Sequence, residues 1–140
     1  MILADVNVLL SAFRPDAEHH KVAHNWLDGV VNGNAAYGVS PQVLSSVVRL
    51  ATNRRVFATP SSPAQALAYC DQLLIQPNAH VIVPGVRHWP IFKQLCIDAN
   101  ARANLVPDAW FAALTIEHGC EWVTFDRDFA RFPSLKWRVP

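Results

Sequence analysis

Cysteine, charge and long apolar runs are all scarce in this chain, and each scarcity excludes a class of protein. The 140 residues include three cysteines, Cys70, Cys96 and Cys120, and none forms a CxxC pair. A disulfide framework or a thiolate zinc site is therefore not expected. No apolar run approaches the length of a membrane span, and the first residues lack the pattern of a signal peptide. These absences predict a cytoplasmic protein with no membrane segment.

Charged residues make up 16% of the chain, and the net charge is +1. Bulk electrostatics therefore give no sign of nucleic-acid binding, although the local placement of the 12 basic residues can still matter. Half of the residues are apolar, and no linker, repeat or low-complexity tract interrupts them. A single domain over residues 1–140 is the expected organisation.

Short apolar runs alternate with amphipathic stretches along the chain. We expect strands over residues 1–5, 35–39, 80–84, 121–125 and 136–139, with 80–84 buried because it is rich in β-branched residues. We expect helices over 7–13, from a cap at Asp16 to Val31, from Ser40-Pro41 to Asn53, after the capping box Ser62 to Gln65, over 90–101, and from Pro107 to Gly119. This alternation predicts a three-layer α/β/α fold with a central, mostly parallel sheet.

Four aspartates fall at positions that such a fold brings together. Asp5 ends the first expected strand, Asp126 and Asp128 follow the strand 121–125, and Asp108 lies in the first turn of a helix. The carboxyl ends of parallel strands form the crevice in which α/β sheets bind ligands. Carboxylates gathered there repel one another without a cation, and oxygen-only clusters suit hard ions such as Mg²⁺ or Mn²⁺. The sequence therefore predicts a metal site.

Each aspartate also has a purely structural explanation when it is considered alone. Asp5 and Asp126 could serve as turn or cap residues, Asp108 could stabilise its helix start, and Asp128 could be a solvated loop acid. The combination favours a functional role for Asp5, Asp108 and Asp126, whereas Asp128 is the weakest of the four.

The order and spacing of these motifs resemble the PIN-domain nucleases. The Asp that ends the first strand is followed two residues later by Asn7, a later Asp opens a helix, and the sequence TFDRDF at 124–129 follows a strand. Within that family, the chain length and the sequence NLVPDA at 104–109 are similar to VapC-type toxins of bacterial toxin-antitoxin pairs. The resemblance extends over nearly the whole chain.

This resemblance implies a Mg²⁺- or Mn²⁺-dependent endoribonuclease that is held inactive by a VapB-type antitoxin and is usually a homodimer. It implies that Asp5, Asp108 and Asp126 hold the ion and act in catalysis. Supporting roles, as an additional acid or in orienting carboxylates and waters, are implied for Asn7, Thr124 and Asp128.

One position departs from the family's pattern. The helix after Ser40-Pro41 usually supplies a glutamate, whereas the matching residue here is Ser46, and no acid occurs between Asp28 and Asp71. The site is then expected to bind its ion more weakly, to hold it through a water on Ser46, or to hold one ion where relatives hold two. A second interpretation stays open, namely a weakly active or inactive PIN-like module that binds RNA or protein.

Two other classes that use strand-end acids fit less well. A phosphoacceptor receiver domain would carry an Asp after its central strand, where this chain has Pro84. A phosphatase with an aspartyl nucleophile would carry a second Asp two residues after the first, where this chain has Asn7.

Basic, imidazole and apolar side chains give weaker signals. Candidates for contacts to phosphate are Arg14, Arg49, Arg54, Arg55, Arg102 and Arg127. His20 and His24, with His19 beside them, share a helical face without a third ligand at suitable spacing, which favours a solvated surface. The apolar stripe of Val8, Leu9, Leu10 and Phe13 is expected in the core, and the resemblance leaves part of it open to an antitoxin or a dimer partner.

Overall fold

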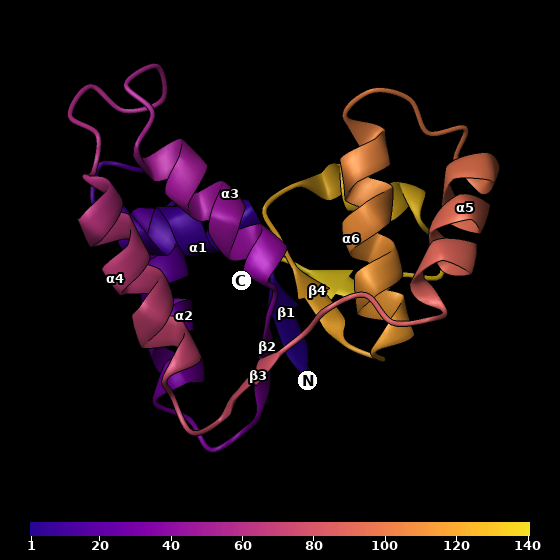
Figure 1. Ribbon diagram of the computed structural model, residues 1–140, viewed down its shortest axis with the longest axis horizontal. Coiled ribbons are helices and arrows are strands. Elements are labelled where there is room, and N and C mark those ends of the chain that lie inside the picture. The colour runs from indigo at the N-terminus through magenta and orange to yellow at the C-terminus, as the bar shows by residue number, and fades with distance from the viewer.

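All five strands are parallel, and helices cover both faces of the sheet. The computed structural model describes residues 1–140. Its sheet has the order β3-β2-β1-β4-β5 and is built from β1 (Ile2–Ala4), β2 (Tyr37–Val39), β3 (Ala79–Val81), β4 (Glu121–Val123) and β5 (Trp137–Arg138). Figure 1 shows α1 (Val6–Phe13), α2 (His20–Val31), α3 (Pro41–Ala51) and α4 (Pro63–Leu74) on one side of the strands and α5 (His88–Asp98) and α6 (Leu105–Glu117) on the other. The predicted three-layer α/β/α class is confirmed.

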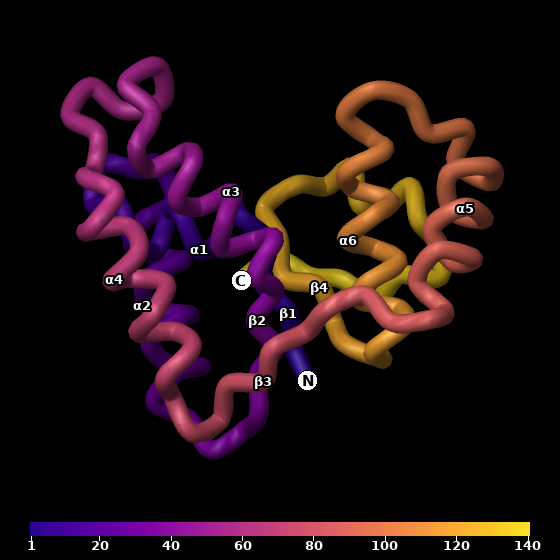
Figure 2. The backbone as a smooth tube through the Cα atoms, viewed as in Figure 1, coloured from indigo at the N-terminus to yellow at the C-terminus, as the bar shows by residue number.

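The path of the chain changes direction across the sheet between β1 and β4. Strand β1 pairs with β2 on one side and with β4 on the other. Helices α1, α2, α3 and α4 lie on one side of the sheet, and residues 82–87 carry the chain from there to the side of α5 and α6 (Figure 2). Because the connections from β1 and into β4 lie on opposite faces, the two strand ends form a topological switch point, where open α/β sheets bind ligands. A short 3₁₀ helix, η1 (Arg127–Arg131), follows β4.

Aromatic and aliphatic side chains from both halves of the chain form one core. Trp122 of β4 is fully buried, and its ring centroid lies 5.5 Å from that of Phe111 on α6 and 5.5 Å from that of Phe129. Leu3 of β1 and Val8 of α1 are also fully buried, which agrees with the core role predicted for the first helix. The apolar residues are spread over short elements, and none of the helices has the length and hydropathy that crossing a bilayer requires.

Several helix boundaries follow from local side-chain chemistry. The predicted capping box is present: Ser62 Oγ accepts from the Gln65 N–H (3.2 Å), and Gln65 Oε1 accepts from the Ser62 N–H (2.9 Å). Ser40 caps α3 by accepting from the Val43 N–H (3.4 Å). Gly119 follows α6 with φ of +63°, a conformation that glycine adopts without steric cost, so the predicted helix stop is confirmed.

Three local predictions were wrong. The strand expected to be buried at 80–84 covers only Ala79–Val81 and lies at the edge of the sheet with Val81 exposed, because only β2 pairs with it. Asp16 does not cap α2, since its carboxylate pairs with Arg14 (2.8 Å) and the helix begins only at His20. Helix α6 begins two residues before Pro107.

Candidate metal centre

Asp5 lies where β1 ends and α1 begins, and hydrogen bonds fix its position. Its N–H donates to the Val123 carbonyl of β4 (2.9 Å). Its Oδ1 caps α1 by accepting from the Val6 N–H (2.6 Å), and its Oδ2 accepts from Thr124 Oγ1 (2.6 Å) and Asn7 Nδ2 (3.1 Å). Only 8% of the residue is exposed. The short helix that starts at this carboxylate therefore holds it in place.

Asn7 and Thr124 join the ends of β1 and β4. Asn7 Nδ2 donates to Thr124 Oγ1 (3.2 Å), and Asn7 Oδ1 accepts from the Phe125 N–H (3.2 Å). Thr124 Oγ1 also accepts from the Asp126 N–H (2.9 Å), and Asp126 Oδ1 accepts from the Asp128 N–H (2.9 Å). A continuous set of hydrogen bonds thus connects Asp5 to the turn that carries the later acids.

Three of the four predicted aspartates line one cavity, and Asp5 lies nearby without lining it. Asp108, at the start of α6, lines a cavity of about 480 Å³ together with Asp126 and Asp128. Asp5 is near enough for its charge to act on Asp108. Ser46 lies half-buried on α3, does not line this cavity and makes no hydrogen bond to any of the four, so its supporting role stays a prediction.

Burial and mutual repulsion make two of these acids hard to ionise. Burial raises the pKa of Asp5 to about 6 against the hydrogen bonds that it accepts, and the charge of Asp126 adds to the increase. Burial also raises the pKa of Asp108 to about 6, with further contributions from Asp126, Asp5 and Asp128. A bound cation would relieve both effects, because it favours the ionised carboxylates.

The donor set fits a hard divalent ion that also takes water or phosphate oxygens. Asp108 is half-buried yet accepts no hydrogen bond from the protein, which leaves both of its oxygens available to a ligand. No group of three His, Cys, Asp or Glu side chains is close enough to form a ready-made ligand shell. Mg²⁺ sites commonly combine one or two carboxylates with waters and substrate phosphates, so this arrangement suits that chemistry better than a closed site.

Two arginines also line the cavity, and sequence reasoning named only one of them. Arg102 was among the candidates for phosphate contacts, whereas Arg131 was not. Residues i and i+3 eclipse in a 3₁₀ helix, so recognising 127–131 as such a helix would have placed Arg131 on the same side as Asp128. Arg14, another candidate, instead holds Asp16 and Ser61.

The PIN domain family matches residues 2–135. The chain belongs to the PIN-domain family. Over its full length it is 41% identical to ribonuclease VapC43 of Mycobacterium tuberculosis, of which 95% is covered. Over 97% of its length it is also 41% identical to ribonuclease VapC31 of the same organism, of which 96% is covered. The resemblance to VapC-type proteins is confirmed.

Solved structures support the PIN fold independently of sequence identity. The VapBC2 structure from Rickettsia felis, bound to a promoter DNA fragment, superposes with a TM-score of 0.73 at 17% identity and covers 100% of this chain and 99% of its own. VapC20 of Mycobacterium tuberculosis, described as a sarcin-ricin loop cleaving toxin, gives a TM-score of 0.68 at 17% identity, with 93% of each chain covered.

Replacing Asp108 with Asn is expected to stabilise the metal-free protein at neutral pH, by roughly 1 kcal/mol after allowance for solvent screening of this half-exposed group. In the folded state the pKa values of Asp5 and Asp108 are about 6, above the ordinary 3.8. The folded chain therefore binds these protons more tightly, and the free energy of unfolding falls as the pH rises from about 4 to about 6. The free energy of unfolding of Asp108→Asn should therefore fall less as the pH rises. Denaturant titration in EDTA measures this free energy.

Asp71→Asn is the matched control, because Asp71 is an exposed acid on α4 that lies outside the cavity. This variant should keep the pH dependence of the wild type. An equally steep fall in Asp108→Asn and in the wild type would contradict the raised pKa of Asp108.

Proposed function

We propose that this PIN-domain protein is a metal-dependent endoribonuclease of the VapC type. The proposal is supported by the cavity that Asp108 and Asp126 line, by the closeness of Asp5 to Asp108, and by the 41% identity of the chain to VapC ribonucleases. These three residues would hold Mg²⁺ or Mn²⁺ and act in catalysis. We propose that the protein acts in the cytoplasm, where its RNA substrate would be found.

The chain's own residues supply position and charge for the reaction. Bound in the cavity, the ion would lower the pKa of an attacking water and offset the negative charge that develops on the phosphate. Asp5 is held by its hydrogen bonds before any substrate binds, which limits the reorganisation needed for catalysis. Asn7 and Thr124 would keep Asp5 and Asp126 in register, and the more exposed Asp128 would orient the water.

The alternative is a PIN-like module that binds RNA or protein without cutting it. Ser46 supports this alternative, because it stands where the family's pattern has a glutamate and the structure supplies no other acid from α3. The cavity still contains three aspartates without Ser46, which is why cleavage is the preferred function.

Asp108→Asn is expected to reduce RNA cleavage to the level seen with EDTA, because one of the ion's oxygen ligands loses its charge. The measurement is cleavage of total cellular RNA and of a fluorogenic single-stranded RNA, with and without Mg²⁺ or Mn²⁺. Asp71→Asn, which also removes one acidic charge, should cleave like the wild type.

Two results would separate the hypotheses. Metal-dependent cleavage by Asp108→Asn at the wild-type rate would reject the assignment of the site. RNA binding by the wild type without cleavage under any of these conditions would instead establish the non-catalytic module.

Arg102 and Arg131 are proposed to hold the RNA backbone beside the acids. Both are exposed, neither forms an ion pair, and both line the cavity of Asp108 and Asp126. Arg131 also lines a neighbouring cavity of about 270 Å³ with Asp98. A strand that follows both cavities would pass over the Arg131 guanidinium, which can bind phosphate through two hydrogen bonds.

Arg131→Ala is expected to weaken RNA binding similarly for all sequences and to lower the magnitude of the salt slope by about 0.7, the value for one contact to single-stranded nucleic acid. Fluorescence anisotropy in the Asp108→Asn background measures binding without cleavage. Lys93→Ala is the control, because this exposed cation on α5 lines neither cavity. An unchanged slope in Arg131→Ala would reject the contact.

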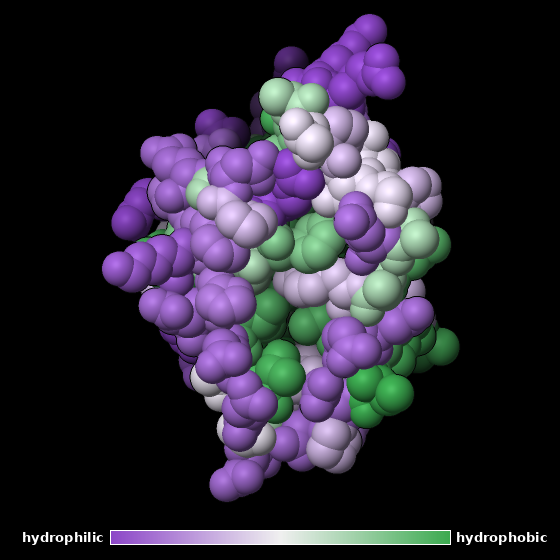
Figure 3. All heavy atoms as spheres, turned by 90° about the vertical axis from the view of Figure 1, so that its left-hand side faces the viewer, coloured by the Kyte–Doolittle hydropathy of each residue, from purple (hydrophilic) through white to green (hydrophobic).

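A VapB-type antitoxin is proposed to bind the groove between α2 and α4. The groove has a volume of about 500 Å³, and its apolar lining includes Phe13, Leu27, Val31 and Leu73. Figure 3 shows apolar residues along a hollow that is flanked by polar side chains. Several solved structures with this fold are VapBC or FitAB assemblies, which supports a partner of this kind. An antitoxin segment with one apolar face would suit the groove.

Val31→Glu is expected to abolish co-purification of the product of a short reading frame directly upstream, because it places a charge in the apolar groove. Val22→Glu is the matched control, since Val22 is 51% exposed on the same helix and does not line the groove. Retention of the antitoxin by Val31→Glu would exclude this surface.

Light scattering on the same samples tests the proposed homodimer, which should have twice the 15.6 kDa mass of one chain.

A further inference from the structure

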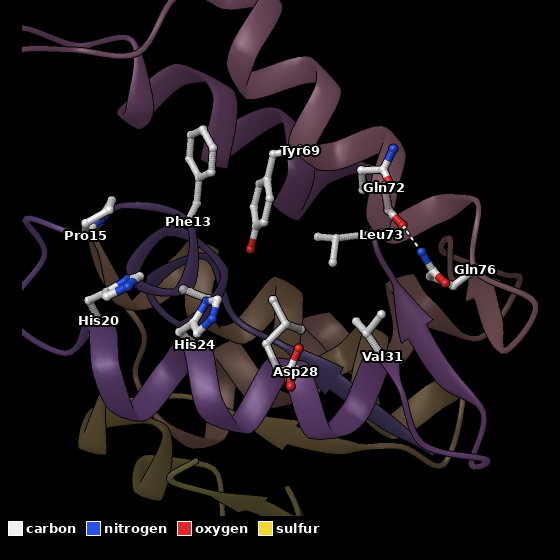
Figure 4. Close-up of a pocket in the computed structure, with 12 residues that line it drawn as sticks. Phe13, Pro15, His20, His24, Asp28, Val31, Tyr69, Gln72, Leu73 and Gln76 are labelled. Carbon is white, nitrogen blue, oxygen red and sulfur yellow. Dashed lines mark hydrogen bonds between the residues drawn. The ribbon is translucent and has the colours of Figure 1, made fainter.

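Two histidines of α2 face the same end of the groove between α2 and α4. His20 and His24 lie one helical turn apart, and their ring centroids are separated by 5.2 Å. Both residues line the groove. Figure 4 shows the two imidazoles next to each other, across the groove from Phe13 and Tyr69. Residues at this spacing can bind one ligand together.

The ring of His20 is already oriented for ligation. Its Nδ1 lies 2.8 Å from the carbonyl oxygen of Ser11. A carbonyl only accepts, so Nδ1 carries the proton and the lone pair of Nε2 is left for another partner. Metal-ligating histidines are commonly held in this way, with the second ring nitrogen donating to a carbonyl or a carboxylate.

The side chain of His24 is free to bind a ligand. His24 makes no hydrogen bond, and Asp28, one turn further along α2, contributes a negative charge to the same groove. His19 differs, because its ring stacks on Phe125 with centroids 4.4 Å apart and it does not line the groove. His19 is therefore a control for replacements of His20 and His24.

We propose that His20 and His24 form a binding site for a borderline divalent transition metal ion, with Cu²⁺ bound most tightly and water completing the coordination. Imidazole nitrogens suit Cu²⁺, Ni²⁺ and Zn²⁺, whereas Mg²⁺ and Mn²⁺ prefer oxygen ligands. The site is therefore chemically separate from the aspartate cavity. Since no third protein ligand is close, the ion exchanges with solvent and is not a closed structural centre.

The test is a Cu²⁺ titration followed by electron paramagnetic resonance, in excess Mg²⁺ to occupy the carboxylates. The wild type should bind one equivalent with hyperfine coupling to two imidazole nitrogens. His24→Ala should lose this signal and weaken binding by about tenfold or more, whereas His19→Ala should match the wild type.

Equal affinity in His24→Ala and the wild type, or an equal loss in His19→Ala, would overturn the proposal. His20→Ala should behave like His24→Ala, and thermal unfolding without metal checks that loss of the Ser11 contact has not unfolded it. If His20→Ala is unfolded, His24→Ala decides the question alone, because this side chain has no hydrogen bond to lose. RNA cleavage is not measured, so failure here leaves the proposed nuclease function untouched.

Discussion

The hydrogen bonds that Asp5 accepts from Thr124 and Asn7 are the interaction on which the candidate site depends. Asp5 and Thr124 are 119 positions apart in the chain, so their 2.6 Å contact forms only when β1 and β4 pair in the correct register. Shifting the register by one residue would turn every side chain of a strand to the opposite face of the sheet. The fully buried Leu3 and Trp122 prevent such a shift, because it would remove both from the core.

The same arrangement lowers the stability of the folded chain. Burial and neighbouring charges oppose ionisation of Asp5 and Asp108, whereas metal binding requires the ionised carboxylates. Hydrogen bonds lower this cost for Asp5, but Asp108 has no such support from the protein. Functional sites often retain groups of this kind that reduce stability, and the rest of the core compensates for them.

The parts of the structure that local chemistry decides could be predicted from the sequence, whereas the parts that depend on topology could not. The positions of Asp5, Asp108 and Asp126 relative to strands and helices could be read from apolar runs and helix-start signals. The exposure of Val81 could not, because an apolar β-branched run is the same in a central and an edge strand. The position of Arg131 beside the acids could not be predicted, because a 3₁₀ helix of five residues leaves little periodicity in the sequence. The groove between α2 and α4 also depends on how separate helices pack.

Asp5 both caps α1 and belongs to the candidate site, and this decides where an inactivating substitution is best placed. One oxygen of its carboxylate caps α1, and the other accepts from Thr124 and Asn7. An amide has only one acceptor oxygen, so Asp5→Asn would lose one of these two sets of bonds, and loss of chemistry could not be separated from loss of structure. Asp108 has no bond to the protein to give up. It is therefore the better position for a variant meant to trap the proposed RNA substrate, which would be crystallised uncut on an otherwise native surface.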